Sequence, residues 1–384
     1  MAKTSFVPNP AKIKVVGCGG GGCNAITRMV REEIRGVEFI AMNTDTQALA
    51  LTEAPVRVQL GERLTRGLGA GGDHNLGRKA AEETRDEIAE LIWGADMVFI
   101  TAGMGGGTGT GAAPVVAEVG KQSGALTIAV VTKPFTFEGS HRRRVAEEGI
   151  ATLLGKVDTL IIIPNDRLLT LCDQKTSVDS AFKLADDVLR HGVQAISEVI
   201  TVPGLINLDF ADVKAVMKDA GPAWMSIGNG QGKSRAVDAA KEALSSPLLD
   251  VSIKGSKGVL FNVVGGENLS LFEVNEAANI IKQAVDPEAN IIFGVAFDSR
   301  MENEVRITLI ATGFRVKLGE EGSVQDDELA RMLKEIKTEE ELDLPSFLRR
   351  PQFSHRRQSI SHTQPLIKGV PQRHPVKETT YEIS

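Results

Sequence analysis

A glycine-rich segment, GMGGGTGTGAAP at residues 103–114, constrains the fold of this 384-residue chain more than any other stretch. It contains six glycines and two threonines, and it lies between an apolar run, Met97–Ile100, and a helix-like run, Ala112–Lys121. Glycines between a strand and a helix expose backbone N–H groups, and the helix N-terminus adds partial positive charge. We therefore predict a site for nucleotide phosphates here; the alternative is an ordinary flexible turn.

A second glycine-rich segment, GCGGGGCNA at residues 17–25, opens the first βαβ pattern of the chain. It follows the apolar run Ile13–Val16 and precedes a helical pattern that continues to about Arg35. A second apolar run, Val37–Met42, then ends in the Asn-Thr-Asp sequence of residues 43–45. Such a unit predicts a parallel sheet with a right-handed crossover.

The second segment also fits a dinucleotide fingerprint, so NAD is an alternative ligand. Its glycines have the G-x-G-x-x-G spacing, and Asp45 follows at about the distance that the fingerprint requires. That interpretation leaves residues 103–114 unexplained, together with a third glycine segment, GLGAGG at residues 67–72. Three such segments favour a polyphosphate held from several sides. A P-loop is excluded at residues 103–114, because no lysine follows the glycines.

The remaining pattern up to residue 315 alternates between strands and helices. Residues 177–201 form the longest uninterrupted helical pattern, which stops before Pro203. We therefore predict an α/β fold, in which a Rossmann-type parallel sheet is joined by a long central helix to a smaller α+β domain. The other strands are expected at 95–101, 126–132, 159–163, 223–227, 258–264, 290–297 and 304–311, and the other helices at 75–93, 235–244 and 271–285.

Composition narrows the class of partner. The net charge is −6 and aromatic residues make up only 4%, which argues against nucleic acid as a partner. The three cysteines have no metal-ligand spacing, and their low, odd number fits a reducing cytosol. Residues 1–11 are expected to be a disordered leader without the apolar core of a signal peptide. The sequence contains no run of about 18 apolar residues, so we expect no direct insertion into a membrane.

Together these motifs closely resemble the FtsZ family, the bacterial cell-division GTPases of the tubulin superfamily. The matching sequences are GCGGGGCNA, NTD, GLGAGG, GMGGGTGTGAAP, KPFTFEG, NLDFADV and GGENLSLFEVNEAANII. The resemblance covers about residues 12–315. It implies a tubulin-like fold, GTP hydrolysis to GDP and phosphate, head-to-tail filaments of the protein itself, and a cytoplasmic location concentrated in the cytokinetic ring at midcell.

The resemblance also implies roles for individual residues. Gly19–Gly22 and Gly105–Gly109 should wrap the phosphates, Ala70 and Gly71 should sense the γ-phosphate, and Mg²⁺ should sit on the phosphates without a cage of protein side chains. Glu138 and Arg142 should meet the ribose and phosphates. The implied GTP-binding residues are Gly19, Gly20, Gly21, Gly22, Asn24, Arg28, Asn43, Asp45, Ala70, Gly71, Gly103, Gly105, Gly106, Gly107, Thr108, Gly109, Glu138, Arg142, Asn165, Phe182 and Asp186.

Three of these residues have ordinary alternatives. A carboxylate such as Asp186 can accept from the N1–H and 2-amino groups of guanine, and Phe182 can stack on the ring. Equally, Phe182 could belong to the core, Asp186 to a solvated helix face, and Arg142 to a basic cluster at the start of its helix.

Asp209 and Asp212, with Asn207 before them, are the implied catalytic residues that polarise the attacking water. The alternative is that the two aspartates cap the start of a helix. A helix of about 25 residues is about 37 Å long, so these residues should not reach the nucleotide of their own chain. They could reach a nucleotide presented by the next subunit, which predicts an active site completed in trans within an open filament.

The tail is expected to consist of an acidic spacer, a partner-binding peptide near residues 341–350, and a basic disordered end. Leu342, Leu344, Phe347 and Leu348 have helix-like spacing that suits a groove on a membrane-tethering or regulatory division protein. The predicted divisions of the chain are a leader at 1–11, a GTP-binding domain at 12–176, the central helix at 177–202, an α+β domain with the catalytic loop at 203–315, and the tail at 316–384.

Overall fold

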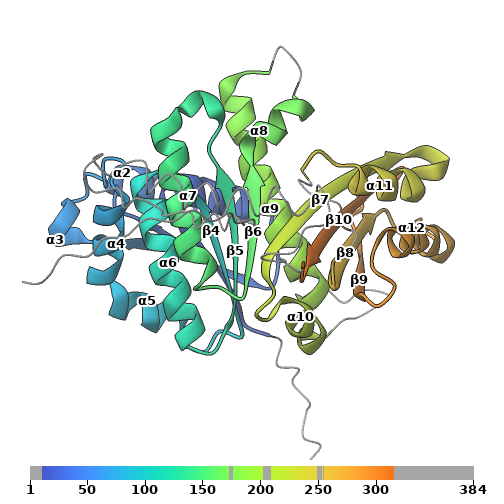
Figure 1. The fold of residues 1–384 in the computed structure, drawn as a ribbon, viewed down its shortest axis with the longest axis horizontal. Helices are drawn as coiled ribbons and strands as arrows, with labels where there is room; N and C mark the ends of the chain where they lie inside the picture. The colour runs from blue at the N-terminus through green and yellow to red at the C-terminus, as the bar shows by residue number, and fades with distance from the viewer. Residues whose placement is uncertain (1–10, 173–175, 202–208, 249–252, 254, 315–384) are drawn as a thin grey trace, which may run out of the picture. The chain divides into compact units, whose positions relative to one another are not determined.

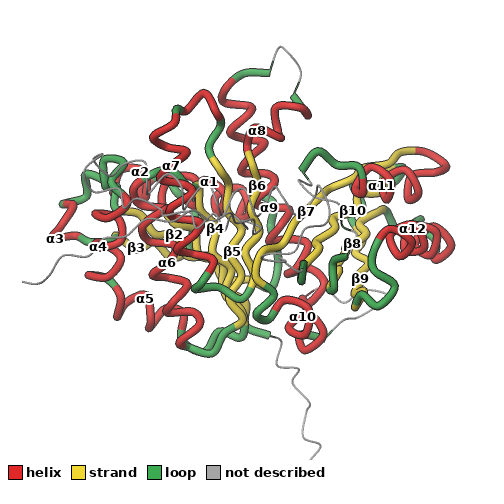
Figure 2. The backbone as a smooth tube through the Cα atoms, in the orientation of Figure 1, coloured by secondary structure: helices red, strands yellow, loops and turns green. Residues whose placement is uncertain are grey.

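The computed structural model describes residues 11–172, 176–201, 209–248, 253 and 255–314, which all belong to one compact unit. Its described strands form a single ten-stranded sheet in the order β3-β2-β1-β4-β5-β6-β7-β10-β8-β9 (Figure 1). The strands run through the middle of the molecule with helices on either side (Figure 2). Residues 1–10 of the predicted leader, Asn207 and the whole predicted tail, with its partner-binding peptide, lie outside the described residues.

The first half of the sheet is parallel, as predicted. Each of its strands pairs in parallel with its neighbours, and its side chains alternate between two apolar clusters, one on each face. A parallel sheet buried on both faces has this pattern of near-continuous apolar strands. These strands are β1 (Ile13–Cys18), β2 (Val37–Asn43), β3 (Val56–Gln59), β4 (Met97–Gly103), β5 (Leu126–Lys133) and β6 (Thr159–Pro164).

Helices cover both faces of this half. Residues of α1, α9 and α10 share one apolar cluster with the sheet, and residues of α4, α5, α6 and α7 share the other. The helices are α1 (Gly19–Arg31), α2 (Thr46–Ala50), α3 (Glu62–Thr65), α4 (His74–Glu83), α5 (Arg85–Ile92), α6 (Gly107–Gln122), α7 (Ser140–Leu154), α8 (Asn165–Leu168), α9 (Val178–Thr201) and α10 (Phe210–Met217).

Two sequence predictions about these helices were wrong in detail. The single helix expected at 75–93 is interrupted at Thr84, which has φ −100° and ψ 10°. The Thr84 hydroxyl donates to Ala80 O and accepts from Gly61 N, so it competes locally with the helical pattern. In addition, α1 and α6 begin inside the glycine segments, so the predicted loops at Gly19 and Gly107 are the first turns of helices.

The second half of the chain adds a mixed sheet. The first three residues of β7 (Gly221–Gln231) pair in parallel with β6, and the rest of the strand pairs antiparallel with β10 (Glu304–Thr312). Next come β8 (Gly258–Gly265), antiparallel to β10, and β9 (Asn290–Phe297), parallel to β8. With α11 (Arg235–Leu244) and α12 (Leu271–Ala284), these strands enclose a third apolar cluster.

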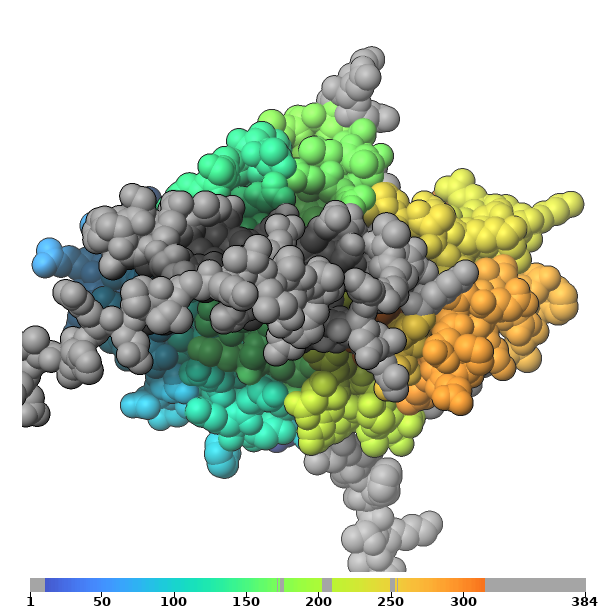
Figure 3. Space-filling model, in the orientation of Figure 1, coloured from blue at the N-terminus to red at the C-terminus, as the bar shows by residue number. Residues whose placement is uncertain are grey.

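This second half confirms the predicted α+β unit, and β7 joins it directly to the parallel sheet. The strand expected at 223–227 extends to both sides because it pairs with two partners in succession. In space-filling view the blue residues of the first half and the orange residues of the second half lie on opposite sides (Figure 3). The predicted boundaries at 176 and 202 stay a prediction.

The long helix α9 runs from the carboxyl ends of the parallel strands to their amino ends. Near its start, the ring of Phe182 lies edge-on to Phe135, which follows the carboxyl end of β5, at 5.4 Å between centroids. At its end, Thr201 Oγ1 donates to Arg35 O, which precedes the amino end of β2. With 24 residues, α9 is about 36 Å long. Figure 1 shows α8 and α10 at its opposite ends.

Candidate nucleotide site

The starts of α1 and α6 meet backbone to backbone, because glycine lets them approach. A Cβ on Gly19 would lie 2.6 Å from Gly109 N, and one on Gly22 would lie 2.4 Å from Thr101 O. Gly107 is similarly closed in by Ala70 and Asp73, where its Cβ would lie 2.8 Å from the Ala70 methyl. These glycines bring the three predicted glycine segments together at the carboxyl edge of β1 and β4.

Other glycines of the same segments face open space. A Cβ added to Gly20, Gly71, Gly72 or Gly106 would meet no heavy atom within 4 Å. Packing among the described residues therefore does not explain the glycines at positions 20 and 106, whereas Gly71 and Gly72 have φ values of 57° and 86°, which favour glycine in themselves. In addition, neither α1 nor α6 has a side-chain hydrogen bond at its N-cap, so no capping side chain satisfies the first backbone N–H groups. Two such helix starts beside open glycines form a cradle suited to phosphate groups.

The other phosphate candidates line this cradle. Gly21 packs against the end of β4, where its Cβ would lie 3.2 Å from Gly103 N. Gly105 is held by a hydrogen bond of 2.9 Å from its N–H to Thr110 Oγ1. Thr108 Oγ1 lies 2.6 Å from Thr44 Oγ1.

A second group of side chains surrounds the start of α9. Phe182 is 40% exposed and belongs to a cluster of three rings with Phe135 and Phe137. The alternative that it is a core residue is therefore wrong. Asn165, the first residue of α8, is buried, and its Oδ1 has no hydrogen-bond partner among the residues that the structure describes. A buried amide oxygen without a partner is costly, so this atom is suited to a polar ligand group.

Arg28 of α1 holds two carboxylates of α9. Its Nε lies 3.4 Å from Asp186 Oδ2, and its Nη1 donates to Asp187 Oδ1 at 3.1 Å. Burial raises the pKa of Asp186 to about 6, against the opposing effect of Arg28. Since its side chain is only 16% exposed, Asp186 is not part of a solvated helix face. Asn24, the remaining candidate for the guanine, is exposed on α1.

Glu138 and Arg142 form an ion pair beside the cradle. Arg142 Nη1 donates to Glu138 Oε2, and Glu138 Oε1 accepts from Phe135 N at 2.8 Å. The carbonyl of Arg142 closes in on Gly105, where a Cβ would lie 2.7 Å away. The Arg142 backbone thus packs against the α6 glycine segment, while its side chain is 54% exposed, so its role toward the phosphates stays a prediction.

Asn43 and Asp45 are engaged within the chain. Asn43 Oδ1 accepts from Asp45 N at 3.3 Å, and Asp45 Oδ1 caps α2 by accepting from Gln47 N at 2.9 Å. Among the residues that the structure describes, no three His, Cys, Asp or Glu side chains gather into a metal site.

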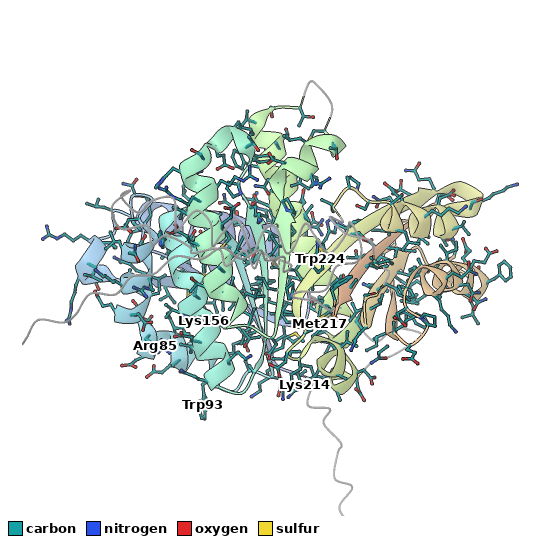
Figure 4. The ribbon with its side chains drawn as sticks, in the orientation of Figure 1. Arg85, Trp93, Lys156, Lys214, Met217 and Trp224 are labelled. Carbon is teal, nitrogen blue, oxygen red and sulfur yellow. The ribbon has the colours of Figure 1, made fainter. Side chains whose placement is uncertain are left out.

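The aspartates predicted to be catalytic lie away from the cradle. Asp209 caps α10 and Asp212 completes a reciprocal capping box, with Asp212 N donating to Asp209 Oδ1 at 2.9 Å. The end of α10 lies at the amino edge of the sheet, since Thr159, the first residue of β6, donates to Met217 O. In Figure 4, Lys214 of α10 lies near the lower edge of the view, and so does Trp93, which precedes β4. The capping alternative is thus confirmed, and both aspartates are exposed.

The sequence interpretation missed several neighbours of the site. Thr44, Asp187 and Phe137 contact predicted site residues, and Gly72 faces the same open space as Gly71. A signal was present for Thr44 and Gly72, which lie inside the NTD and GLGAGG motifs. No pattern in the sequence distinguishes Asp187 from Asp186.

A parallel sheet with a glycine cradle and a long helix leading to an α+β unit defines a tubulin-like nucleotide-binding protein. The chain matches the GTPase domain of the Tubulin/FtsZ family over residues 12–173 and the C-terminal domain of the FtsZ family over residues 221–315. It belongs to the FtsZ family. The alternative drawn from the fingerprint at residues 17–25, NAD as the ligand and hence an NAD-dependent oxidoreductase, is therefore wrong.

Solved structures agree with this assignment. FtsZ of M. jannaschii, in an empty dimer, is 47% identical with a TM-score of 0.78, and the match covers 82% of this chain and 95% of that chain. A point mutant of M. jannaschii FtsZ is 50% identical with a TM-score of 0.78, covering 79% and 92%. CetZ2 from Haloferax volcanii, a GTPγS-bound protofilament, shares the fold at 17% identity and a TM-score of 0.69, covering 86% and 99%.

Proposed function

We propose that this chain hydrolyses GTP at joints between copies stacked head to tail, and that the resulting filaments build the division ring of the cell. The observation that carries the proposal is the separation of two half-sites in one chain. The glycine cradle follows the carboxyl ends of β1 and β4, whereas Asp209 and Asp212 lie at the start of α10, a helix whose last residue, Met217, contacts the amino end of β6. A head-to-tail stack would bring the second half-site of one copy to the cradle of the next.

The chemistry of the two half-sites is complementary. The starts of α1 and α6, with Thr108, supply N–H and O–H donors to phosphate oxygens. Asn165 and Asp186 offer acceptors to guanine, which adenine cannot match at N1. The exposed carboxylates of Asp209 and Asp212 can orient and polarise a water, since positioning and electrostatics supply most of the catalysis in phosphoryl transfer.

The cap at α10 does not exclude this role. Asp209 and Asp212 accept from each other's backbone N–H, which leaves further lone pairs on each carboxylate for a water. Mg²⁺ on the phosphates would neutralise charge that develops there. Asp45, whose Oδ1 caps α2, could act on such an ion through water with its other oxygen.

Self-association is supported by the relative that is 47% identical, an FtsZ dimer. We propose that residues near 341–350, outside the described part of the chain, dock on membrane-tethering and regulatory division proteins. No helix of the described residues is long and apolar enough to cross a membrane. Midcell concentration would then follow from these partners.

The test is phosphate release, combined with pelleting, over a range of protein concentrations with GTP, ATP and NAD⁺. The proposal predicts turnover and pelleting with GTP alone, and a rate per subunit that rises with protein concentration. A rate per subunit that stays constant down to high dilution would contradict the shared site. Pelleting with GTP but without phosphate release would instead favour a non-hydrolysing tubulin-like scaffold.

A further inference from the structure

Thr44 connects two of the three glycine segments, although it belongs to neither. It follows β2 and is fully buried. Its Oγ1 lies 2.6 Å from Thr108 Oγ1 in the first turn of α6, a normal length for a hydrogen bond between hydroxyls. The pair therefore joins the end of β2 to the helix start that forms one side of the cradle.

The backbone of Thr44 holds the other segment. Its carbonyl accepts from Gly69 N at 3.2 Å and from Thr65 Oγ1 at 3.4 Å. The next residues continue the contact, because Thr46 N donates to Gly67 O and Asp45 forms a β-bridge with Leu68. The Ala70–Gly72 turn, with its two open glycines, begins directly after this attachment.

Counting protons fixes the direction of the hydrogen bond between the two hydroxyls when a phosphate is bound. Each threonine hydroxyl has one proton and can also accept. Ionised phosphate oxygens act as acceptors, so Thr108 must give its proton to the phosphate. The hydrogen bond between the hydroxyls must then run from Thr44 to Thr108. Such a chain strengthens both bonds, because each donor polarises the next.

We propose that Thr44 is a positioning residue for the nucleotide phosphates. Its hydroxyl donates to Thr108 Oγ1 and directs the Thr108 proton into the cradle, while its carbonyl fixes the strand that leads into Ala70–Gly72. The phosphates then meet the α6 start and the Ala70 turn as one preorganised surface. This inference rests on the proposed function, which places the phosphates at Thr108.

The test is the affinity of the full chain for GDP, measured by titration calorimetry, in Thr44→Val. Losing a hydrogen bond that orients a phosphate donor should weaken GDP binding about 5- to 30-fold. Thr44→Ser keeps the hydroxyl and should restore binding to near the wild-type value. Thr127→Val is the matched control, because Thr127 is equally buried and its hydroxyl donates to Ala125 O at the amino end of β5. This control should bind GDP like wild type.

A double-mutant cycle separates positioning from general damage. Since Thr44 acts through Thr108, Thr44→Val should cause little further loss of GDP affinity when Thr108 is already valine. Wild-type affinity in Thr44→Val, or the same loss with and without the Thr108 hydroxyl, would overturn the proposal. If Thr44→Val does not fold, Thr44→Ala gives the same comparison. A wild-type chain that binds no GDP would contradict the proposed function itself, and this inference with it.

Discussion

Arg28 and Asp186 face each other between α1 and α9, with 3.4 Å from Arg28 Nε to Asp186 Oδ2. Arg28 is shared with Asp187, so its charge does not fully compensate the burial of Asp186. The pKa of Asp186 is consequently raised to about 6 by burial. A carboxylate with that pKa changes its charge just below neutral pH, which makes its proposed role in guanine binding testable.

GDP affinity should fall at mildly acidic pH. Only the ionised carboxylate of Asp186 can accept two hydrogen bonds from guanine, and it becomes protonated as the pH falls through about 6. Below that pH the affinity should decrease by up to about tenfold per unit. Titration calorimetry with GDP between pH 5 and pH 8 checks this. Asp186→Asn should bind weakly at every pH, with the step near pH 6 removed; an unchanged step in this variant would show that another group titrates.

Substitutions at two neighbouring glycines should have opposite consequences. Gly20→Ala should leave the fold intact, with an effect between neutral and about 1 kcal/mol of stabilisation, because its Cβ meets nothing and alanine favours a helix. It should still weaken GDP binding about tenfold or more, since the methyl group enters the cradle. Thermal unfolding and GDP titration on the same sample measure both effects.

Gly22→Ala is the matched comparison on the same helix. Its Cβ would lie 2.4 Å from Thr101 O, so the backbone of β4 would have to move. We expect a loss of about 1–3 kcal/mol or more in the free energy of unfolding. Equal destabilisation by Gly20→Ala and Gly22→Ala would contradict this prediction, because it would mean that the chain itself fills the space beside Gly20.

The buried ion pair of the second half should dominate its stability. Arg235 is 6% exposed, donates to both carboxylate oxygens of Glu273, and also bonds Asn268 and Glu302 O. Hydrogen bonds from Arg235 lower the pKa of Glu273 to about 2. Arg235→Met should therefore cost about 3–5 kcal/mol at neutral pH. Urea unfolding followed by the fluorescence of Trp224 in β7, in a Trp93→Phe background that removes the other tryptophan, reports on this half.

The pH dependence of that loss has a definite sign. Glu273 has a lowered pKa, so its contribution is present above its ordinary value of 4.5 and is lost as the pH falls toward about 2. The difference between wild type and Arg235→Met should shrink over this range. Arg300→Met is the control, because the Arg300 side chain is 72% exposed in its pair with Asp298 and should cost at most about 1 kcal/mol. Equal losses in the two variants would contradict the account.

The order of strands and helices could be predicted because buried parallel strands are apolar along their whole length. The break at Thr84 could not, since it depends on Gly61, 23 residues earlier in the chain. The glycine motifs indicated where the site lies. They did not reveal which glycines pack against backbone, such as Gly22, and which face open space, such as Gly20. That distinction depends on strands and helices brought together from distant parts of the chain.

Mixing two inactive variants tests the central claim most directly. Asp212→Ala retains the cradle, and Gly20→Leu retains Asp212 but fills the cradle. Each alone should release little phosphate from GTP. If the site is shared between head-to-tail copies, an equal mixture should recover up to roughly a quarter of the wild-type rate, since that fraction of random joints pairs an intact cradle with an intact Asp212. Two results would contradict the account. One is a mixture no more active than the sum of its parts, and the other is a wild-type rate of phosphate release from Asp212→Ala alone.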